Sequence, residues 1–190
     1  MKRLLLILIL TLSFQSLTKA EDIRDFEIEG MSIGDSLLDH YSESEIIRYK
    51  ATPYKNKKWS IVAKGDSTFK TYGGFQVHVK TNDSKYIIGS LEGMILYENK
   101  IKECYKQQEE ITFELDNLFK NSRILEWKEP HSADKTGNSI AKSKQYSLQN
   151  DDVIRVTCID WSVQMGMIDK LKVAIYTKEF DLWIHNEAYK

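Results

Sequence analysis

The sequence is poor in cysteine, histidine and proline, and it has no excess of positive charge. Its 190 residues include two cysteines, four histidines and two prolines, and 27 basic side chains stand against 28 acidic ones. A nucleic-acid-binding surface needs a basic stripe, so this balance argues against a nucleic-acid partner. After residue 20 there is no apolar run of the about 20 residues that a membrane-spanning helix requires. No internal repeat is present, and a chain of about 170 residues suits one domain with a hydrophobic core.

The beginning of the chain has the pattern of a secretory signal peptide. Lys2 and Arg3 give a positive start, residues 4–14 form an apolar run, and small residues occupy positions 18 and 20. This run is too short to span a membrane, and no cysteine lies near position 20 to carry a lipid anchor. We therefore predict a signal peptide over 1–20 and an exported chain over 21–190, either periplasmic or secreted. An uncleaved N-terminal anchor is the alternative.

Hydrophobic periodicity predicts one α+β domain over 21–190, with an antiparallel sheet and helices packed on one face of it. Short connections between successive strands favour antiparallel pairing. The predicted helices are 33–41, 43–50, 101–121 and 178–188, and the predicted strands are 59–63, 75–80, 86–97, 144–149, 153–161 and 171–177. The polar stretch 128–143 shows no periodicity and is predicted to be a long loop, either flexible or functional.

Local signals support several of these boundaries. Ser32 with Asp35 matches the capping-box pattern that begins a helix, and so does Ser42 with a glutamate three residues later. Gly89 and Gly93 interrupt the third predicted strand. Glycine inside a strand indicates a bulge or a bend, so we expect an irregular ladder at this point.

Both cysteines lie in the predicted exported chain, where an oxidising compartment favours a disulfide. Ile154, Val156 and Cys158 share one face of their strand, and Cys104 lies in the apolar stripe of the long predicted helix. A helix packed on that strand face would bring the two sulfur atoms together. We predict a Cys104–Cys158 disulfide, with two buried free thiols as the alternative. Since no cysteine or histidine at ligand spacing accompanies either residue, no metal or other cofactor is predicted.

Gly34-Asp35-Ser36-Leu37 resembles the nucleophile motif of the GDSL esterases and lipases, which carry it near the mature N-terminus. The resemblance implies a serine hydrolase with Ser36 as its nucleophile. That family also has a Gly-x-Asn-Asp block and an Asp-x-x-His pair near the C-terminus. Here the only Asn-Asp pair, at 82–83, follows Lys-Thr, and Asp181 precedes His185 by four positions rather than three. We interpret the motif as the first turn of a helix and keep a Ser36 esterase as an alternative.

The remaining polar residues are weaker site candidates. His131 and Asp134 in the predicted loop could share a cation, although two ligands in a solvated loop are more often only loop residues. His78 lies on the polar side of its predicted strand and is expected to be solvated. The four tryptophans are expected to pack in or around the core, with a ligand groove as the alternative reading of the aromatic residues.

Four stretches give the chain a resemblance to a group of small exported proteins of Pelagibacter-type marine alphaproteobacteria, a group with no assigned activity. They are EGMSIGDSLLDHYSESEI, YIIGSLEGMILYENKIKECYKQQEEI, CIDWS and LKVAIYTKEFDLWI. This resemblance implies a compartment and a fold but no chemistry. Gly30-Met31-Ser32 before a helix is also similar to the small outer-membrane-assembly lipoproteins of the BamE/SmpA kind. A lipobox cysteine and the Leu-Gly-x-Pro of that family are missing, so this likeness implies only an envelope interaction module.

Together these patterns predict an exported, non-catalytic binding or envelope interaction module. The alternatives are the Ser36 esterase and a small-ligand-binding protein. The partner is expected to be an envelope protein or a small ligand. We expect its contacts on the stretch 128–143, or on the sheet face that carries Gln76, His78 and Lys80, because loops and exposed faces carry most binding residues.

Overall fold

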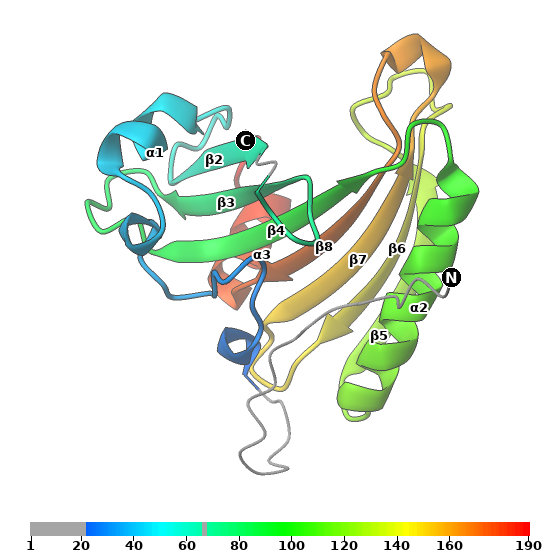
Figure 1. Cartoon of the computed structure of the whole chain (residues 1–190), viewed down its shortest axis with the longest axis horizontal. Coiled ribbons are helices and arrows are strands. Elements are labelled where there is room, and N and C mark those ends of the chain that lie inside the picture. Colours follow the sequence, from blue (N-terminus) through cyan, green and yellow to red (C-terminus); the bar gives the residue numbers. More distant parts are fainter. Residues whose placement is uncertain (1–21, 66–67) are drawn as a thin grey trace.

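The computed structural model describes residues 22–65 and 68–190, so the predicted signal peptide 1–20 lies outside the described residues. The described chain forms an eight-stranded antiparallel sheet with three α-helices, which confirms the α+β class (Figure 1). The strands are β1 (Lys50–Ala51), β2 (Trp59–Gly65), β3 (Gly74–Lys80), β4 (Ile88–Leu96), β5 (Arg123–Pro130), β6 (Ile140–Ser147), β7 (Val153–Asp160) and β8 (Lys170–Tyr176). The helices are α1 (Glu43–Tyr49), α2 (Ile101–Leu118) and α3 (Lys178–Asn186).

The order of the strands is β1-β2-β3-β4-β8-β7-β6-β5, so the sheet is built from two halves. In the first half, successive strands are neighbours from β1 to β4. Helix α2 then carries the chain across the sheet to the far edge, where β5 begins (Figure 1). The chain returns strand by strand until β8 pairs with β4 in the middle. The arrangement leaves β5 as one edge of the sheet.

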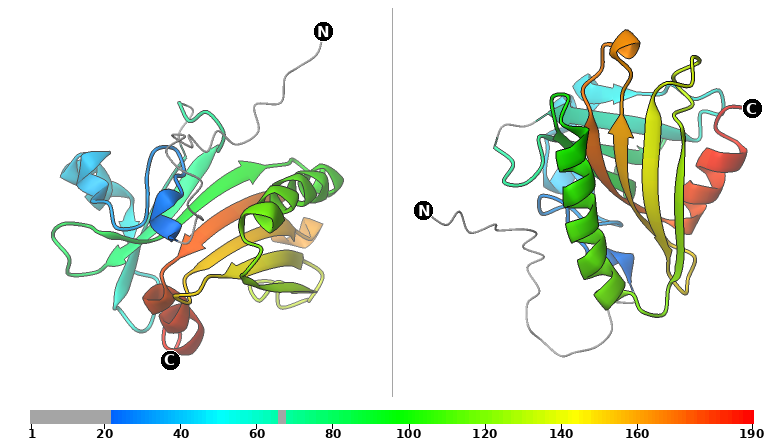
Figure 2. Two further views of the ribbon diagram at one scale, coloured as in Figure 1. Left: turned by 90° about the horizontal axis from the view of Figure 1, so that it is seen from below. Right: turned by 90° about the vertical axis from the view of Figure 1, so that its right-hand side faces the viewer.

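The helices do not share one face of the sheet, and that part of the prediction was wrong. Helix α2 packs on the face that carries Cys158 and Leu171, which we call the α2 face. Helix α3 packs its aromatic side chains against Ala174 and Tyr176 on the opposite side, the α3 face. Figure 2 shows the sheet between these two helices. Strand β8 has buried side chains on both faces, Val173 and Ile175 on the α2 face and Ala174 and Tyr176 on the α3 face, so each side has a covering layer.

The core on the α2 face is the larger of the two. Besides α2, it takes in the N-terminal segment, α1 and the alternate side chains of the central strands; among its fully buried members are Met31, Leu37, Ile46, Val77 and Leu91. The predicted disulfide is present here and joins α2 to β7, with a Cα–Cα distance of 6.0 Å between Cys104 and Cys158. The two half-cystines have no exposed surface. The covalent link therefore fixes the long helix on this face.

The helix predicted over 33–41 was wrong. Its only helical part is a 3₁₀ turn over Leu37–Asp39, with Ser36 as the N-cap residue. Asp35 does accept a hydrogen bond from the Ser32 backbone N–H at 2.8 Å. However, Gly34 has φ of +93°, a left-handed conformation that a right-handed helix does not contain. By contrast α1 begins with the predicted capping box at Ser42.

Gly89 forms the expected irregularity in β4. The ladder between β3 and β4 shifts between His78 and Val79, so Gly89 lies in a bulge. The Trp59 ring lies over this glycine, and a Cβ atom there would stand 2.3 Å from the ring. Only glycine admits this close approach. Gly93 has a similar role, because the Tyr72 ring lies 2.6 Å from the position of its absent Cβ.

The long loop predicted over 128–143 was also wrong. Strand β5 extends to Pro130 and β6 begins at Ile140, so the connection contains only residues 131–139. Seven of the eight β5 residues are exposed. Because neither side of β5 is buried, it has no alternation of apolar and polar residues by which a strand is predicted from sequence.

Candidate functional site

Ser36 is held by backbone contacts and not by a catalytic base. Its hydroxyl donates to the Lys85 carbonyl oxygen at 2.6 Å and accepts from the Leu38 backbone N–H at 3.2 Å. A serine nucleophile needs a base at hydrogen-bond distance, oriented by a third group. Among the described residues no histidine is hydrogen-bonded to this hydroxyl, and His40 lies beside Asp35 at 3.9 Å instead. The local geometry is that of a helix cap.

Asp134 and His131 have separate sets of contacts in the structure. The Asp134 carboxylate accepts hydrogen bonds from Thr136, from Ser139 and from the Ser162 hydroxyl at 2.9 Å. These hydrogen bonds hold the pKa of Asp134 well below its usual range. The His131 ring instead packs on the Trp161 ring, with centroids 4.4 Å apart. The pair ties the connection 131–139 to the neighbouring hairpin, which is a structural role.

In the part of the chain that the structure describes, no three His, Cys, Asp or Glu side chains are grouped so as to hold a metal ion. Within the same residues, none of the helices has the length and apolar character needed to cross a bilayer.

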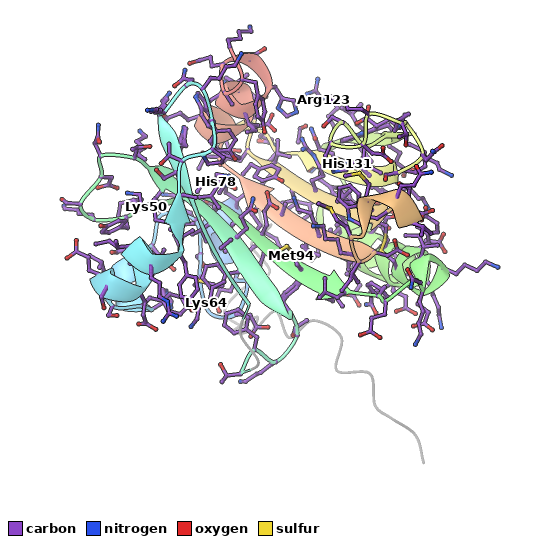
Figure 3. The ribbon with its side chains drawn as sticks, turned by 90° about the horizontal axis from the view of Figure 1, so that it is seen from above. Lys50, Lys64, His78, Met94, Arg123 and His131 are labelled. Carbon is purple, nitrogen blue, oxygen red and sulfur yellow. A yellow bond between two sulfur atoms is a disulfide. The ribbon has the colours of Figure 1, made fainter. Side chains whose placement is uncertain are left out.

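His78 is buried, so the prediction that it is solvated was wrong. Its exposed fraction is 2%, and its ring is hydrogen-bonded to the Tyr54 hydroxyl at 2.7 Å and to the Ser90 hydroxyl at 3.1 Å. The Phe180 ring of α3 lies 4.3 Å away, centroid to centroid. Burial lowers the pKa of His78 to about 4. Figure 3 shows His78 and His131 on separate parts of the molecule.

A buried ion pair lies close to His78 on the α3 face. Glu92 is 4% exposed, pairs with the Lys172 ammonium and accepts a hydrogen bond from the Tyr176 hydroxyl at 3.0 Å. Burial alone would raise the pKa of Glu92, but Lys172 and the other partners outweigh burial and lower it. Glu92 and Lys172 thus pair with each other inside the protein. The face that was expected to be open is covered by α3 at His78, whereas Gln76 is half-buried and Lys80 is exposed.

The β5 edge is the most accessible regular element. No described strand pairs with its outer side. The His131 backbone N–H donates to the Ser139 carbonyl at 2.8 Å, in register with the β5–β6 pairs. In an antiparallel sheet, alternate residues of a strand direct their backbone N–H and C=O groups to opposite sides. The odd-numbered residues of β5 therefore form their backbone hydrogen bonds with β6. The even-numbered ones, Ile124, Glu126, Lys128 and Pro130, direct their backbone groups outward.

Side chains on the two faces of β5 differ in character. On the α2 face Glu126 binds the Lys144 ammonium at 2.9 Å, and Lys128 stands opposite Lys142 in the ladder. On the α3 face the Trp127 ring lies 5.5 Å from the Arg155 guanidinium. Its indole N–H donates to Glu129 at 3.0 Å. The edge thus combines alternating charge with a half-buried aromatic ring.

An open pocket of about 420 Å³ lies beside this edge, on the α2 face. Its lining includes Gln108, Glu109 and Thr112 from α2, with Glu126, Lys142 and Lys144 from the strands. The Gln108 amide N–H₂ donates to the carbonyls of Lys142 at 2.8 Å and Val156 at 2.9 Å. Its Oε1 is buried and has no hydrogen-bond partner among the described residues. The pocket is therefore lined mainly by polar residues, and one of them, Gln108, has a buried acceptor that no described residue donates to.

Comparison of the chain with family models, with curated proteins and with solved structures gave no match. The functional argument therefore rests on the residues themselves. Of the residues singled out from the sequence, Ser36 caps a 3₁₀ turn, Asp134 holds the connection 131–139, and His131 and His78 pack against aromatic rings. The β5 edge was missed because exposed residues carry no periodic signal, although Trp127 between two opposite charges lies at its centre.

Proposed function

We propose that this protein is an exported, non-catalytic interaction module that binds another protein along the β5 edge. The observation that carries the proposal is the exposed, regular eight-residue edge strand whose outer backbone groups pair with no described strand. Such an edge is a template for strand addition, in which backbone hydrogen bonds give affinity and side chains give specificity. The signal-peptide pattern and the disulfide support export to the periplasm or beyond.

The opposite edge differs in a way that supports this assignment. There the terminal strand β1 has only two residues, and it follows directly on α1. Very short edge strands are one of the devices by which proteins avoid unwanted pairing. Strand β5 has a proline only at its last position, and its register with β6 is regular throughout. One edge is shortened, and the other is left available over its whole length.

A photo-crosslinking amino acid placed on the edge tests the proposal in living cells. At position 128, on β5, it is expected to give a discrete adduct with a protein. At position 106 it serves as the matched control because Lys106 is also exposed but lies on α2 and not on the strand edge. Adducts that are absent at 128, or equally strong at 106, would contradict binding along β5.

The esterase alternative is tested separately with purified protein and a serine-directed fluorophosphonate. Because no described residue acts as a base at the Ser36 hydroxyl, we expect no labelling and no hydrolysis of short acyl esters. Labelling that disappears in Ser36→Ala would establish the esterase instead.

Binding of a small ligand in the pocket beside α2 is the second candidate function. It is favoured by the buried, unpartnered Oε1 of Gln108, since an acceptor of this kind is costly unless something donates to it. Native mass spectrometry of protein as cells produce it is expected to detect a bound small molecule that is lost in Gln108→Leu. A wild-type spectrum without any added mass would leave this candidate unsupported.

A further inference from the structure

We infer that the partner on the β5 edge is a second copy of the same chain, paired antiparallel about a two-fold axis through Trp127. This inference deepens the proposed function and rests on it. The two sheets would become one continuous sheet, with the β5 strands of the two copies at its centre. The argument comes from the direction of the backbone groups, the order of the charges and the placement of the helices.

The direction of the backbone groups restricts the possible registers. The outward residues of β5 are the even-numbered ones, and a pair of outward residues must face each other to exchange hydrogen bonds. In a two-fold pairing that keeps each face of the sheet continuous, one residue of β5 faces itself. With Trp127 in that place, Glu126 faces Lys128 of the other copy, and Ile124 faces Pro130. Pro130 can accept through its carbonyl oxygen but has no N–H, so the facing Ile124 carbonyl oxygen lacks a donor and each end of the pairing loses one hydrogen bond.

The charges select this register over its neighbours. A pairing centred on residue 126 would set the two Glu126 carboxylates against each other, and one centred on 128 would do the same with the two Lys128 ammonium groups. Centring on Trp127 instead pairs Glu126 with Lys128 of the other copy, and symmetry provides this attraction twice. The pairing also places a carboxylate beside Lys128, which stands opposite Lys142 within its own sheet. Opposite charges directly across a ladder stabilise the pairing, whereas like charges oppose it.

The other face supplies an aromatic contact at the axis. Trp127 bonds inward, to β6, so across the new interface it would occupy the closer, non-hydrogen-bonded kind of pair. Aromatic pairs at such positions are among the more stabilising cross-strand contacts. The ring is already held in place by Arg155 and Glu129. The two indoles would therefore lie on the same face of the joined sheet, one on either side of the axis.

Neither long helix blocks the approach. Helix α2 packs mainly on β7, to which the disulfide holds it, and on β8, and it borders β5 only across the open pocket. Helix α3 packs mainly on the central strands and reaches β5 only near Arg123, at one end. The exposed side chains of Ile124 and Leu125, at 40% and 45%, would be covered by the second copy.

A charge-exchange series tests the register, with sedimentation velocity on protein as cells produce it. We expect a concentration-dependent dimer for the wild type. Glu126→Lys and Lys128→Glu should each weaken dimerisation by about tenfold or more, because each turns two attractions into two repulsions. The double variant should restore it, and so should an equimolar mixture of the two single variants. Lys106→Glu, the same change of charge on α2, is the control and should dimerise like the wild type.

A cysteine pair tests the position of the axis. Because the two native cysteines are joined to each other, an added cysteine is the only reactive thiol among the described residues. Trp127→Cys should form a disulfide between copies on mild oxidation. Leu125→Cys should not, because the two positions 125 would lie about 14 Å apart along the paired strands. Equal crosslinking of both variants would overturn the register.

A monomer at all concentrations, together with no crosslink from Trp127→Cys, would overturn the inference. The proposed function would survive that result if the adduct at position 128 in cells had the mass of a different protein. An adduct of twice the chain's own mass would support both the proposed function and the pairing of two copies. Failure of the single charge variants to fold is recognised from their circular dichroism, and the cysteine variants then decide the question.

Discussion

Replacing the buried histidine His78 should remove a large part of the dependence of stability on pH. The ring is almost completely buried between Tyr54, Ser90 and the Phe180 ring, and burial lowers its pKa to about 4. In the unfolded chain a histidine has a pKa of about 6.5. Between these two values the unfolded chain binds more protons than the folded one. The free energy of unfolding must therefore fall as the pH is lowered from about 6.5 towards about 4.

The size of the effect follows from the two pKa values. A difference of about 2.5 units corresponds to about 3 kcal/mol in total, of which about 2.5 kcal/mol is lost between pH 7 and pH 4.5. The neighbouring Glu92 and Lys172 affect this value in opposite directions, since the carboxylate favours protonation of the ring and the ammonium disfavours it. Domains of this size are stable by only about 5–15 kcal/mol, so the loss is readily measured.

Urea unfolding of wild type and His78→Gln at several pH values between 7 and 4.5 provides the measurement. The variant keeps polar atoms near Tyr54 and Ser90 but cannot titrate. We expect the wild type to lose about 2.5 kcal/mol more than the variant over this range. The acidic groups lose stability in both proteins, so their contribution cancels in the difference. His185→Gln, at a ring that is more than half exposed, is the control and should behave like the wild type.

If the difference in free energy of unfolding between wild type and His78→Gln stayed constant between pH 7 and 4.5, the reasoning would be refuted. Nuclear magnetic resonance gives an independent check that does not depend on the stability of the variant. The His78 ring resonances of the folded wild type should show no titration between pH 7.5 and about 5.5, because their midpoint is expected near 4. A midpoint close to 6.5 would mean that the ring is open to solvent.

Three further predictions concern the fold itself. Replacing both Cys104 and Cys158 by alanine should lower the free energy of unfolding by about 4 kcal/mol in the chain-entropy model, as measured by urea unfolding, and the unreduced wild type should show no thiol reactivity when denatured. Gly89→Ala should cost about 2–3 kcal/mol in the same assay, because its methyl group would overlap the Trp59 ring; a change below about 0.5 kcal/mol would contradict the close approach. Asp134→Asn should increase proteolytic cleavage within 131–139, since the carboxylate holds that connection; unchanged cleavage would show that it does not.

The sequence by itself determined the elements whose signal is local or periodic. The α2 helix was predicted within three residues of its end because its apolar residues recur on one side along its length. The capping box at Ser42 and the bulge at Gly89 were also recognised, since each depends on a few adjacent residues. The disulfide followed from two patterns combined, a strand face and a helix stripe that each carry one cysteine.

Only the tertiary structure decided which surfaces are covered and which remain accessible. His78 alternates with apolar residues just as a solvated residue would, and it is buried because α3 packs on that side of the sheet. Strand β5 is exposed on both faces and therefore has no alternation of apolar and polar residues. Its backbone pairing with β6 holds it in the sheet. Burial depends on contacts between segments far apart in the chain, and backbone pairing is independent of side-chain pattern. Neither burial nor backbone pairing can be predicted from the local order of residues, so the proposed interaction surface could be found only in the folded molecule.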